Sequence, residues 1–223
     1  MSNRLYDRLK GACADDWQAY TEHAFVRQLA AGSLPEESFR HYLGQDYLFL
    51  IHFARAYALA VYKSDNLADM RAAAETINGL LNVEMALHVD YCAGWGLTES
   101  DMEALPEAKA TMAYTRYVLE KGMAGDILDL QAALAPCVIG YGEIGRRLAD
   151  GAETVRDGNP YASWIDMYAG AEYQEIMQKA ISHLDRLAET RMTEARFAAL
   201  AKTFRQATLL EADFWEMGLT LAN

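Results

Sequence analysis

The sequence has few cysteines and prolines, and it lacks the segments that direct a chain into or across a membrane. Its three cysteines, Cys13, Cys92 and Cys137, are odd in number and do not have the spacing of a metal site. Free thiols are typical of a reducing compartment. The first ten residues contain no apolar run of the secretory type, and the most apolar stretch, 47–62, is interrupted by a histidine and an arginine. We therefore expect a cytoplasmic protein with no membrane partner.

Basic residues are also scarce relative to acidic ones. The chain has 20 lysines and arginines against 32 aspartates and glutamates, a formal net charge of −12. A phosphate backbone would be repelled, so nucleic acid is not an expected partner. Hydrophobic residues make up 52% of the 223 positions and charged residues 23%, which is typical of a globular protein. The length predicts one domain over residues 1–223.

The alternation of apolar and polar residues that marks β-strands is absent, and apolar residues instead recur at steps of three and four. Helix-start signals occur at 33–36, 98–101 and 159–160. The spacing predicts long helices over 3–31 (with a break near 19–22), 35–63, 67–93, 101–123, 125–149, 160–190 and 193–220. The sequence therefore predicts an all-α bundle of about seven long helices.

Residues 132–145 are the most informative stretch that is present. Cys137 and Tyr141 are four apart and share a helix face. Pro136 removes a backbone donor, and three nearby glycines allow close approach of another backbone or a ligand. Taken alone, the stretch favours a buried structural cysteine beside a helix kink, because free cysteine is among the most buried residue types. A reactive thiol is the alternative.

Two carboxylates lie on apolar helix faces. Asp46 shares a face with Tyr42 and Phe49, and Glu211 shares one with Phe214. A carboxylate in such a place is costly unless it is paired or hydrogen-bonded, so each could be a structural acid. Two inward-facing acids on separate helices indicate a shared cavity.

A histidine and several tyrosines add to this pattern. Glu84 and His88 are four apart and could bind a metal, but the di-iron motif of helical bundles has a spacing of three and a second copy. A hydrogen-bonded structural histidine is favoured. Tyr114, Tyr141 and Tyr168 fall on the apolar faces of different helices, where their hydroxyls need partners that a planar polar heterocycle would provide.

Together these segments resemble the TenA/Thi-4 family (thiaminase II, or aminopyrimidine aminohydrolase) over nearly the whole chain. The matching stretches are 32–35, 45–50, 53–55, Glu84 with His88, 135–141, 161–168 and 210–215. Each stretch is a weak signal alone, but their order and spacing make the match specific.

The resemblance implies a haem-oxygenase-like bundle, usually assembled as a homotetramer, with no metal or organic cofactor. The family divides into members with and without an active-site cysteine, and Cys137 resembles the first class. Such members are hydrolases of aminopyrimidines and thiamin. The resemblance thus implies cleavage of the exocyclic C–N bond of 4-amino-5-aminomethyl-2-methylpyrimidine, and of thiamin, to the hydroxymethylpyrimidine of thiamin salvage.

The resemblance also implies roles for individual residues. By position, Cys137 matches the nucleophile, Glu211 the acid/base carboxylate and Asp46 the carboxylate that binds the pyrimidine ring. Further residues match the wall of the pocket: Phe49, His88, Tyr114, Tyr141, Tyr168 and Phe214. Many members carry a tyrosine where this chain has Phe49, so one hydroxyl of the family pattern is missing.

Two alternatives remain open. A metal-dependent oxidase of the same fold would need more ligands than Asp46, Glu84 and His88 offer. A non-catalytic pyrimidine-binding or regulatory protein would have an inert Cys137.

Overall fold

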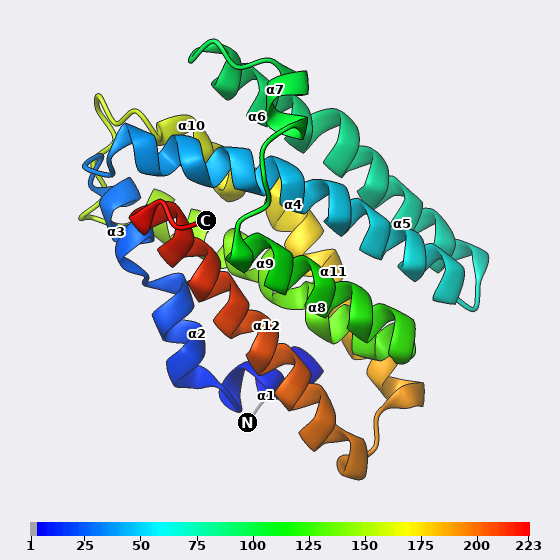
Figure 1. Ribbon diagram of the computed structural model, residues 1–223. Coiled ribbons are helices and arrows are strands. Elements are labelled where there is room, and N and C mark those ends of the chain that lie inside the picture. The colour runs from blue at the N-terminus through cyan, green and yellow to red at the C-terminus, as the bar shows by residue number, and fades with distance from the viewer. Residues whose placement is uncertain (1–3) are drawn as a thin grey trace. The chain divides into compact units, whose positions relative to one another are not determined.

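The computed structural model describes residues 4–223, and this part of the chain consists of helices and connecting turns with no β-strand. The all-α prediction is confirmed. The helices, labelled in Figure 1, are α1 (Leu5–Gly11), α2 (Ala14–Thr21), α3 (Ala24–Ala30), α4 (Glu36–Lys63), α5 (Leu67–Gly79), the π-helical turn η1 (Leu80–Glu84), α6 (Met85–Ala93), α7 (Glu99–Glu103), α8 (Lys109–Ala124), α9 (Ile127–Asp150), α10 (Ala162–Ala169), α11 (Ala171–Arg191) and α12 (Glu194–Thr220).

The first predicted helix, 3–31, is divided twice. Its predicted start at residue 3 lies outside the described residues. One break is at Ala12–Cys13 and the other at Glu22–His23, close to the predicted break. At the second break the His23 side chain accepts a hydrogen bond from the backbone N–H of Phe25, which caps α3. The sequence predicted the second break but not the first.

Two more predicted helices are each divided once. The stretch 101–123 is interrupted between α7 and α8 by a segment that contains Pro106, and the residue before a proline disfavours the helical conformation. The stretch 160–190 is interrupted at Gly170, which is extended with φ −62° and ψ 151°. The single non-helical residue at position 170 does not alter the apolar spacing, so periodicity did not reveal this break.

The helices form two compact units. The cysteine-bearing unit contains Met1–Pro35 and Gln131–Trp215, and the aspartate-bearing unit contains Glu36–Leu130 and Glu216–Asn223. Helices α9 and α12 contribute residues to both units.

An aromatic cluster forms the core of the cysteine-bearing unit. Trp17 of α2 stacks on Phe204 of α12 with ring centroids 5.5 Å apart, and Phe25 of α3 stacks on Trp215 at 5.0 Å. All four side chains are buried. Because aromatic side chains bury more apolar surface than any others, these pairs hold α2 and α3 against α12.

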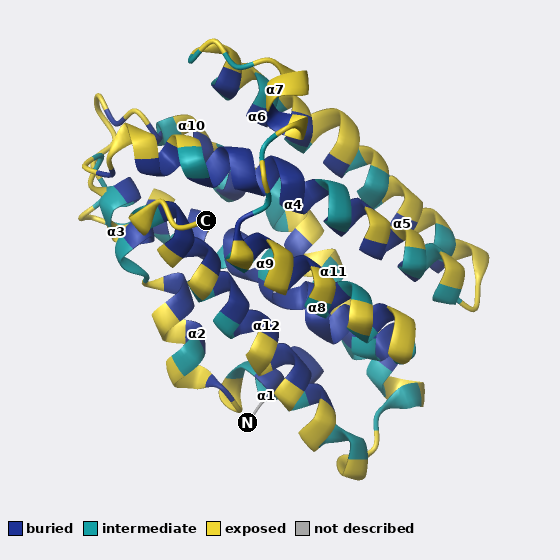
Figure 2. Cartoon of the chain, viewed as in Figure 1, coloured by how far each residue is buried: buried dark blue, intermediate teal, exposed yellow. Residues whose placement is uncertain are grey.

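Helix α4 is the centre of the aspartate-bearing unit and packs against both α5 and α8 (Figure 1). Figure 2 shows that α4 is largely buried, whereas α5 exposes its outer face. The buried Gln45 ties α4 to the start of α8: its Oε1 accepts hydrogen bonds from the Ala108 N–H and the Thr111 hydroxyl, both at 2.8 Å. Its Nε2 donates to the Pro106 carbonyl at 3.0 Å. A buried amide with three partners fixes the position of α8.

Helix α9 is long and apolar enough by composition to cross a membrane, but 83% of its apolar window is buried inside the fold. It is a core helix, and it carries Cys137.

Candidate active site

The segment around Cys137 lies within α9, which is helical from Ile127 to Asp150, and α2 contacts it. Pro136 lies inside the helix and cannot donate a backbone hydrogen bond. Its carbonyl accepts a hydrogen bond from the Tyr20 hydroxyl at 3.3 Å. A side chain at Gly140 would collide with the Tyr20 ring, so glycine is required for this approach. The structure thus confirms that a glycine here admits a neighbouring element.

Exposure distinguishes Cys137 from the other two cysteines. Cys137 is partly exposed, whereas Cys13 and Cys92 are buried. Burial raises the pKa of Cys92 to about 11 and also raises the pKa of Cys13. Thiolate is the reactive form of cysteine, so Cys137 has the access that a nucleophile requires and the other two do not. Cys137 is therefore less buried than the interpretation as a structural cysteine implied, and its role as a nucleophile stays a prediction.

Tyr141, one turn after Cys137, is the centre of an aromatic cluster. Its ring lies 4.9 Å from that of Tyr168 and 5.2 Å from that of Trp215, measured between centroids. Helix α10 can approach because position 145 is glycine: a Cβ there would be 2.5 Å from the Tyr168 carbonyl carbon. The structure thus brings the predicted Tyr141 and Tyr168 together. Trp215 was not predicted as part of the site, although it lies on the same apolar face as Glu211.

The predicted acid of this unit is inward-facing, as expected. Glu211 of α12 is 1% exposed and Phe214 is 2% exposed. Glu211 precedes Trp215 by one turn, and Cys137 precedes Tyr141 by one turn. The contact between the Tyr141 and Trp215 rings therefore joins the turn of α9 that follows the thiol to the turn of α12 that follows the acid. The joint action of Cys137 and Glu211 stays a prediction.

In the aspartate-bearing unit, Asp46 is 4% exposed and accepts two hydrogen bonds on Oδ2. The Tyr42 hydroxyl, one turn earlier on α4, donates at 3.2 Å, and His88 Nε2 on α6 lies 2.6 Å away. The sequence predicted that an acid here needs such partners. It did not identify His88 as one of them, because the two residues are 42 positions apart.

His88 is itself 2% exposed, and its Nδ1 lies 2.8 Å from the Glu84 carbonyl oxygen. Burial alone would lower the pKa of His88, but the hydrogen bond and the charge of Asp46 outweigh burial and raise it. The prediction of a hydrogen-bonded histidine is confirmed. Glu84 takes part through its backbone carbonyl. Within residues 4–223, no group of three or more histidine, cysteine, aspartate or glutamate side chains is arranged to hold a metal ion.

Phe49 and Tyr114 lie together near Asp46. Phe49 follows Asp46 by one turn of α4, and its ring centroid lies 5.0 Å from that of Tyr114 on α8. Both side chains are buried. Because Gln45 holds the start of α8, it also sets the position of Tyr114 on that helix. The sequence analysis did not identify Gln45; the signal that could have done so is an amide on the apolar face of α4.

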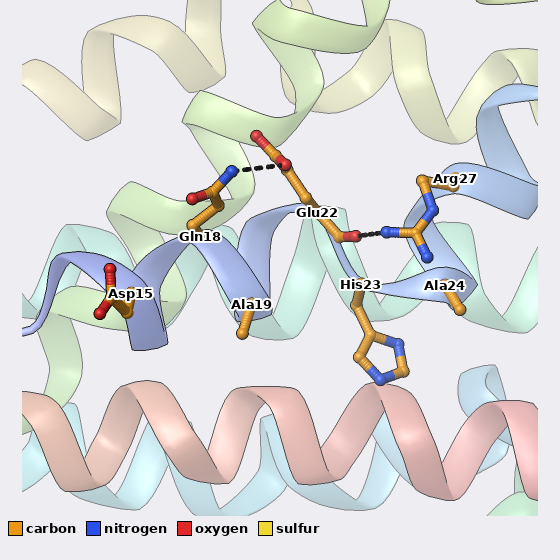
Figure 3. A pocket seen from close by; sticks show the side chains of 7 residues that line it. All are labelled: Asp15, Gln18, Ala19, Glu22, His23, Ala24 and Arg27. Atoms are coloured by element: carbon orange, nitrogen blue, oxygen red, sulfur yellow. Dashed lines mark hydrogen bonds between the residues drawn. The ribbon is translucent and has the colours of Figure 1, made fainter.

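A surface hollow of about 590 Å³ lies over α2 and α3 and contains none of the predicted site residues (Figure 3). Its polar groups are joined to one another: Gln18 donates to Glu22 at 3.0 Å, and Arg27 donates to the Glu22 carbonyl. The hollow is lined by Asp15, Gln18, Ala19, Glu22, His23, Ala24 and Arg27. We assign it no ligand.

Comparison with known proteins agrees with the resemblance seen in the sequence. A protein named aminopyrimidine aminohydrolase from Halalkalibacterium halodurans is 37% identical over 201 residues, which is 90% of this chain and 89% of that protein. A TenA family transcription regulator from Silicibacter sp. TM1040 has a structure with a TM-score of 0.92 and 47% identity, covering 97% of both chains. A domain with a heme oxygenase-like fold from Shewanella denitrificans shares the fold, with a TM-score of 0.74 and 13% identity over 97% of this chain and 92% of that one. The TENA/THI-4/PQQC family model matches residues 12–221, and the chain belongs to this family.

Proposed function

We propose that the protein is an aminopyrimidine aminohydrolase of the thiaminase II type. It would hydrolyse the exocyclic C–N bond of 4-amino-5-aminomethyl-2-methylpyrimidine, and of thiamin, to the hydroxymethylpyrimidine used in thiamin salvage. The observation that carries the proposal is the partly exposed thiol of Cys137, which follows a proline within helix α9 and lies one turn from an aromatic cluster. Relatives named for this activity support it.

In the proposed complex, Asp46 accepts a hydrogen bond from the 4-amino group of the pyrimidine. Aromatic rings of the pocket, including Phe49, Tyr114, Tyr141, Tyr168 and Phe214, contact the planar ring and exclude water. Buried apolar walls strengthen polar contacts to a ligand because they exclude competing water.

The chemistry begins with nucleophilic addition. The thiolate of Cys137 forms a bond to ring carbon C6, and Glu211 gives a proton to the adjacent ring nitrogen. The ring, now electron-rich, expels ammonia from the protonated aminomethyl group, or the neutral thiazole from thiamin, as the C–N bond to the C5 methylene breaks. Water adds to the resulting exocyclic alkene and loses a proton. Glu211 then recovers its proton from the ring nitrogen as the C–S bond breaks, which restores aromaticity and the thiolate.

Further features of the proposal follow from the family resemblance. We expect a homotetramer in the cytoplasm whose residues 1–223 act as a single domain, with a small-molecule pyrimidine as partner and without a metal or organic cofactor. The free thiols and the net charge of −12 support a reducing compartment and argue against nucleic acid as a partner.

The test is ammonia release from the aminopyrimidine, measured beside thiamin cleavage. Cys137→Ser is expected to abolish nearly all turnover while the substrate still binds. Glu211→Gln is expected to lower turnover by about 10²–10⁴-fold, the range for a lost general acid or base. The matched control is Cys13→Ala, whose buried thiol has no role in the scheme and which should retain turnover per folded molecule.

Full activity of Cys137→Ser would refute the nucleophile assignment. Tight binding of the aminopyrimidine by the unaltered protein without any ammonia release would instead favour the non-catalytic binding protein.

A further inference from the structure

The helix that carries His88 contains a π-helical turn immediately before it. Ala73 is buried before this turn and Leu80 is buried at its first position, and the next buried position, Met85, is five residues after Leu80. A step of five is out of phase with an α-helix but matches the hydrogen bond between residues five apart in a π-helix, here from the Met85 N–H to the Leu80 carbonyl. The turn therefore rotates α6 so that Met85, His88 and Cys92 are buried, and α6 packs against α4.

The two contacts of His88 determine where its protons lie. The Glu84 carbonyl oxygen can only accept a hydrogen bond, so Nδ1, 2.8 Å away, must carry a proton. Nε2 lies 2.6 Å from Oδ2 of Asp46, which requires one proton between these two atoms. The pair is either an imidazolium with a carboxylate or a neutral imidazole with a carboxylic acid.

The surroundings favour the imidazolium with the carboxylate. The charged or titratable groups that face the ring are Asp46 on α4 and Glu84 on its own helix, and both are acidic. The Tyr42 hydroxyl donates to the same Oδ2 and so stabilises a carboxylate further. A buried pair with its hydrogen bonds satisfied is the arrangement in which two opposite charges are tolerated.

The contacts also distinguish the two oxygens of Asp46. Both hydrogen bonds that the described residues provide to this side chain end on Oδ2. Oδ1 therefore keeps its capacity to accept a hydrogen bond from a ligand.

We propose that His88 is a positioning residue held as an imidazolium, which occupies Oδ2 of Asp46 and leaves Oδ1, ionised and oriented, to accept a hydrogen bond from the amino group of the pyrimidine. This inference rests on the proposed function and deepens it. Both N–H groups of His88 are already donated, to Glu84 and to Asp46, so His88 itself does not exchange a proton with the substrate.

The first test needs no substrate. In protein labelled with ¹⁵N-histidine, we expect both ring nitrogens of His88 to show the protonated, imidazolium-type signal in the unliganded protein at neutral pH. The signal is assigned by its loss in His88→Gln, with His41→Asn as the matched control that must leave it in place. A pyridine-type Nε2 in the unaltered protein would overturn the proposal.

The second test measures binding of 4-amino-2,5-dimethylpyrimidine, which has no leaving group. His88→Gln keeps a neutral N–H donor near Asp46, whereas His88→Asn keeps only the N–H donor next to the Glu84 carbonyl oxygen. In both variants Oδ2 of Asp46 loses its charged donor, so binding should weaken by about 10- to 100-fold, the equivalent of one charge-assisted hydrogen bond. Tyr42→Phe removes the other donor but no charge, so it should weaken binding less than either His88 variant.

The outcomes separate the two proposals. If His88 is an imidazolium but the unaltered protein neither binds nor cleaves the aminopyrimidine, the proposed function fails and the protonation state stands. If the unaltered protein is active and the His88 variants bind 4-amino-2,5-dimethylpyrimidine as tightly as the unaltered protein, the positioning role fails. Circular dichroism of each variant confirms that it is folded.

Discussion

Glu143 on α9 anchors the N-terminal helices of the cysteine-bearing unit. It accepts hydrogen bonds from the Tyr6 hydroxyl at 2.6 Å, from Lys10 Nζ at 2.7 Å and from Trp17 Nε1 at 3.0 Å. Burial raises the pKa of Tyr6, and the charge of Glu143 adds to the effect, so the phenol remains a donor. The substitution Glu143→Ala removes the acceptor and leaves three donors behind.

The expected loss of stability follows from which donors can reach water. Lys10 has a side chain that is 36% exposed and can be hydrated, so it contributes little. Tyr6 and Trp17 are 4% and 3% exposed, and each unsatisfied buried donor costs about 1–3 kcal/mol. We therefore expect Glu143→Ala to lower the free energy of unfolding by about 2–6 kcal/mol. For a chain of this size, at about 2–4 °C per kcal/mol, that corresponds to a decrease in Tm of about 4–24 °C. Glu143→Gln, which keeps one acceptor oxygen, should have a smaller effect.

The measurement is guanidinium or thermal unfolding followed by circular dichroism and tryptophan fluorescence. The matched control is Glu175→Ala on α11, which removes the exposed partner of Lys179 and should leave the midpoint unchanged. Turnover per folded molecule should survive in both variants. Equal midpoints for Glu143→Ala and Glu175→Ala would refute the reasoning that buried donors, rather than ion pairs in general, make this network important.

Two further predictions concern the candidate site. Gly145→Ala places a Cβ 2.5 Å from the Tyr168 carbonyl carbon, so it should displace α10, destabilise the protein by about 1–3 kcal/mol and lower turnover. Gly11→Ala, with open space around it, should have neither effect. A Gly145→Ala protein as stable and active as Gly11→Ala would contradict the close approach. With a thiol reagent between pH 7 and 8, Cys137 should react in the folded protein, whereas Cys13 and Cys92 should react only after unfolding. Burial raises the pKa of both buried thiols and so lowers the fraction of thiolate at that pH. Mass spectrometry that finds Cys92 of the folded protein modified first would overturn this order.

Helix positions could largely be predicted because they depend on neighbours in the sequence. The cap at Thr98 is an example: its hydroxyl accepts from the Asp101 N–H and the Asp101 carboxylate accepts from the Thr98 N–H, as the residue types indicated. The break at Gly170 could not be predicted, because an extended glycine between two apolar helices leaves no gap in the pattern.

The π turn was hidden for a related reason. Leu81 and Val83, within the turn, are apolar although they are 45% and 65% exposed. Three of the five residues of the turn are apolar, and this conceals the step of five between Leu80 and Met85. Only burial distinguishes the positions that face α4.

The sequence alone determined which chemical groups the protein has and on which helices they lie: a thiol at Cys137, an inward acid at Glu211 and another at Asp46. These assignments follow from residue type and helical spacing. The tertiary structure decided which thiol is accessible and which partners hold Oδ2 of Asp46. The physical reason is that burial and hydrogen bonds depend on residues far apart in the chain, such as Asp46 and His88. The spacing of apolar residues reflects only the local helix and therefore does not predict such pairs.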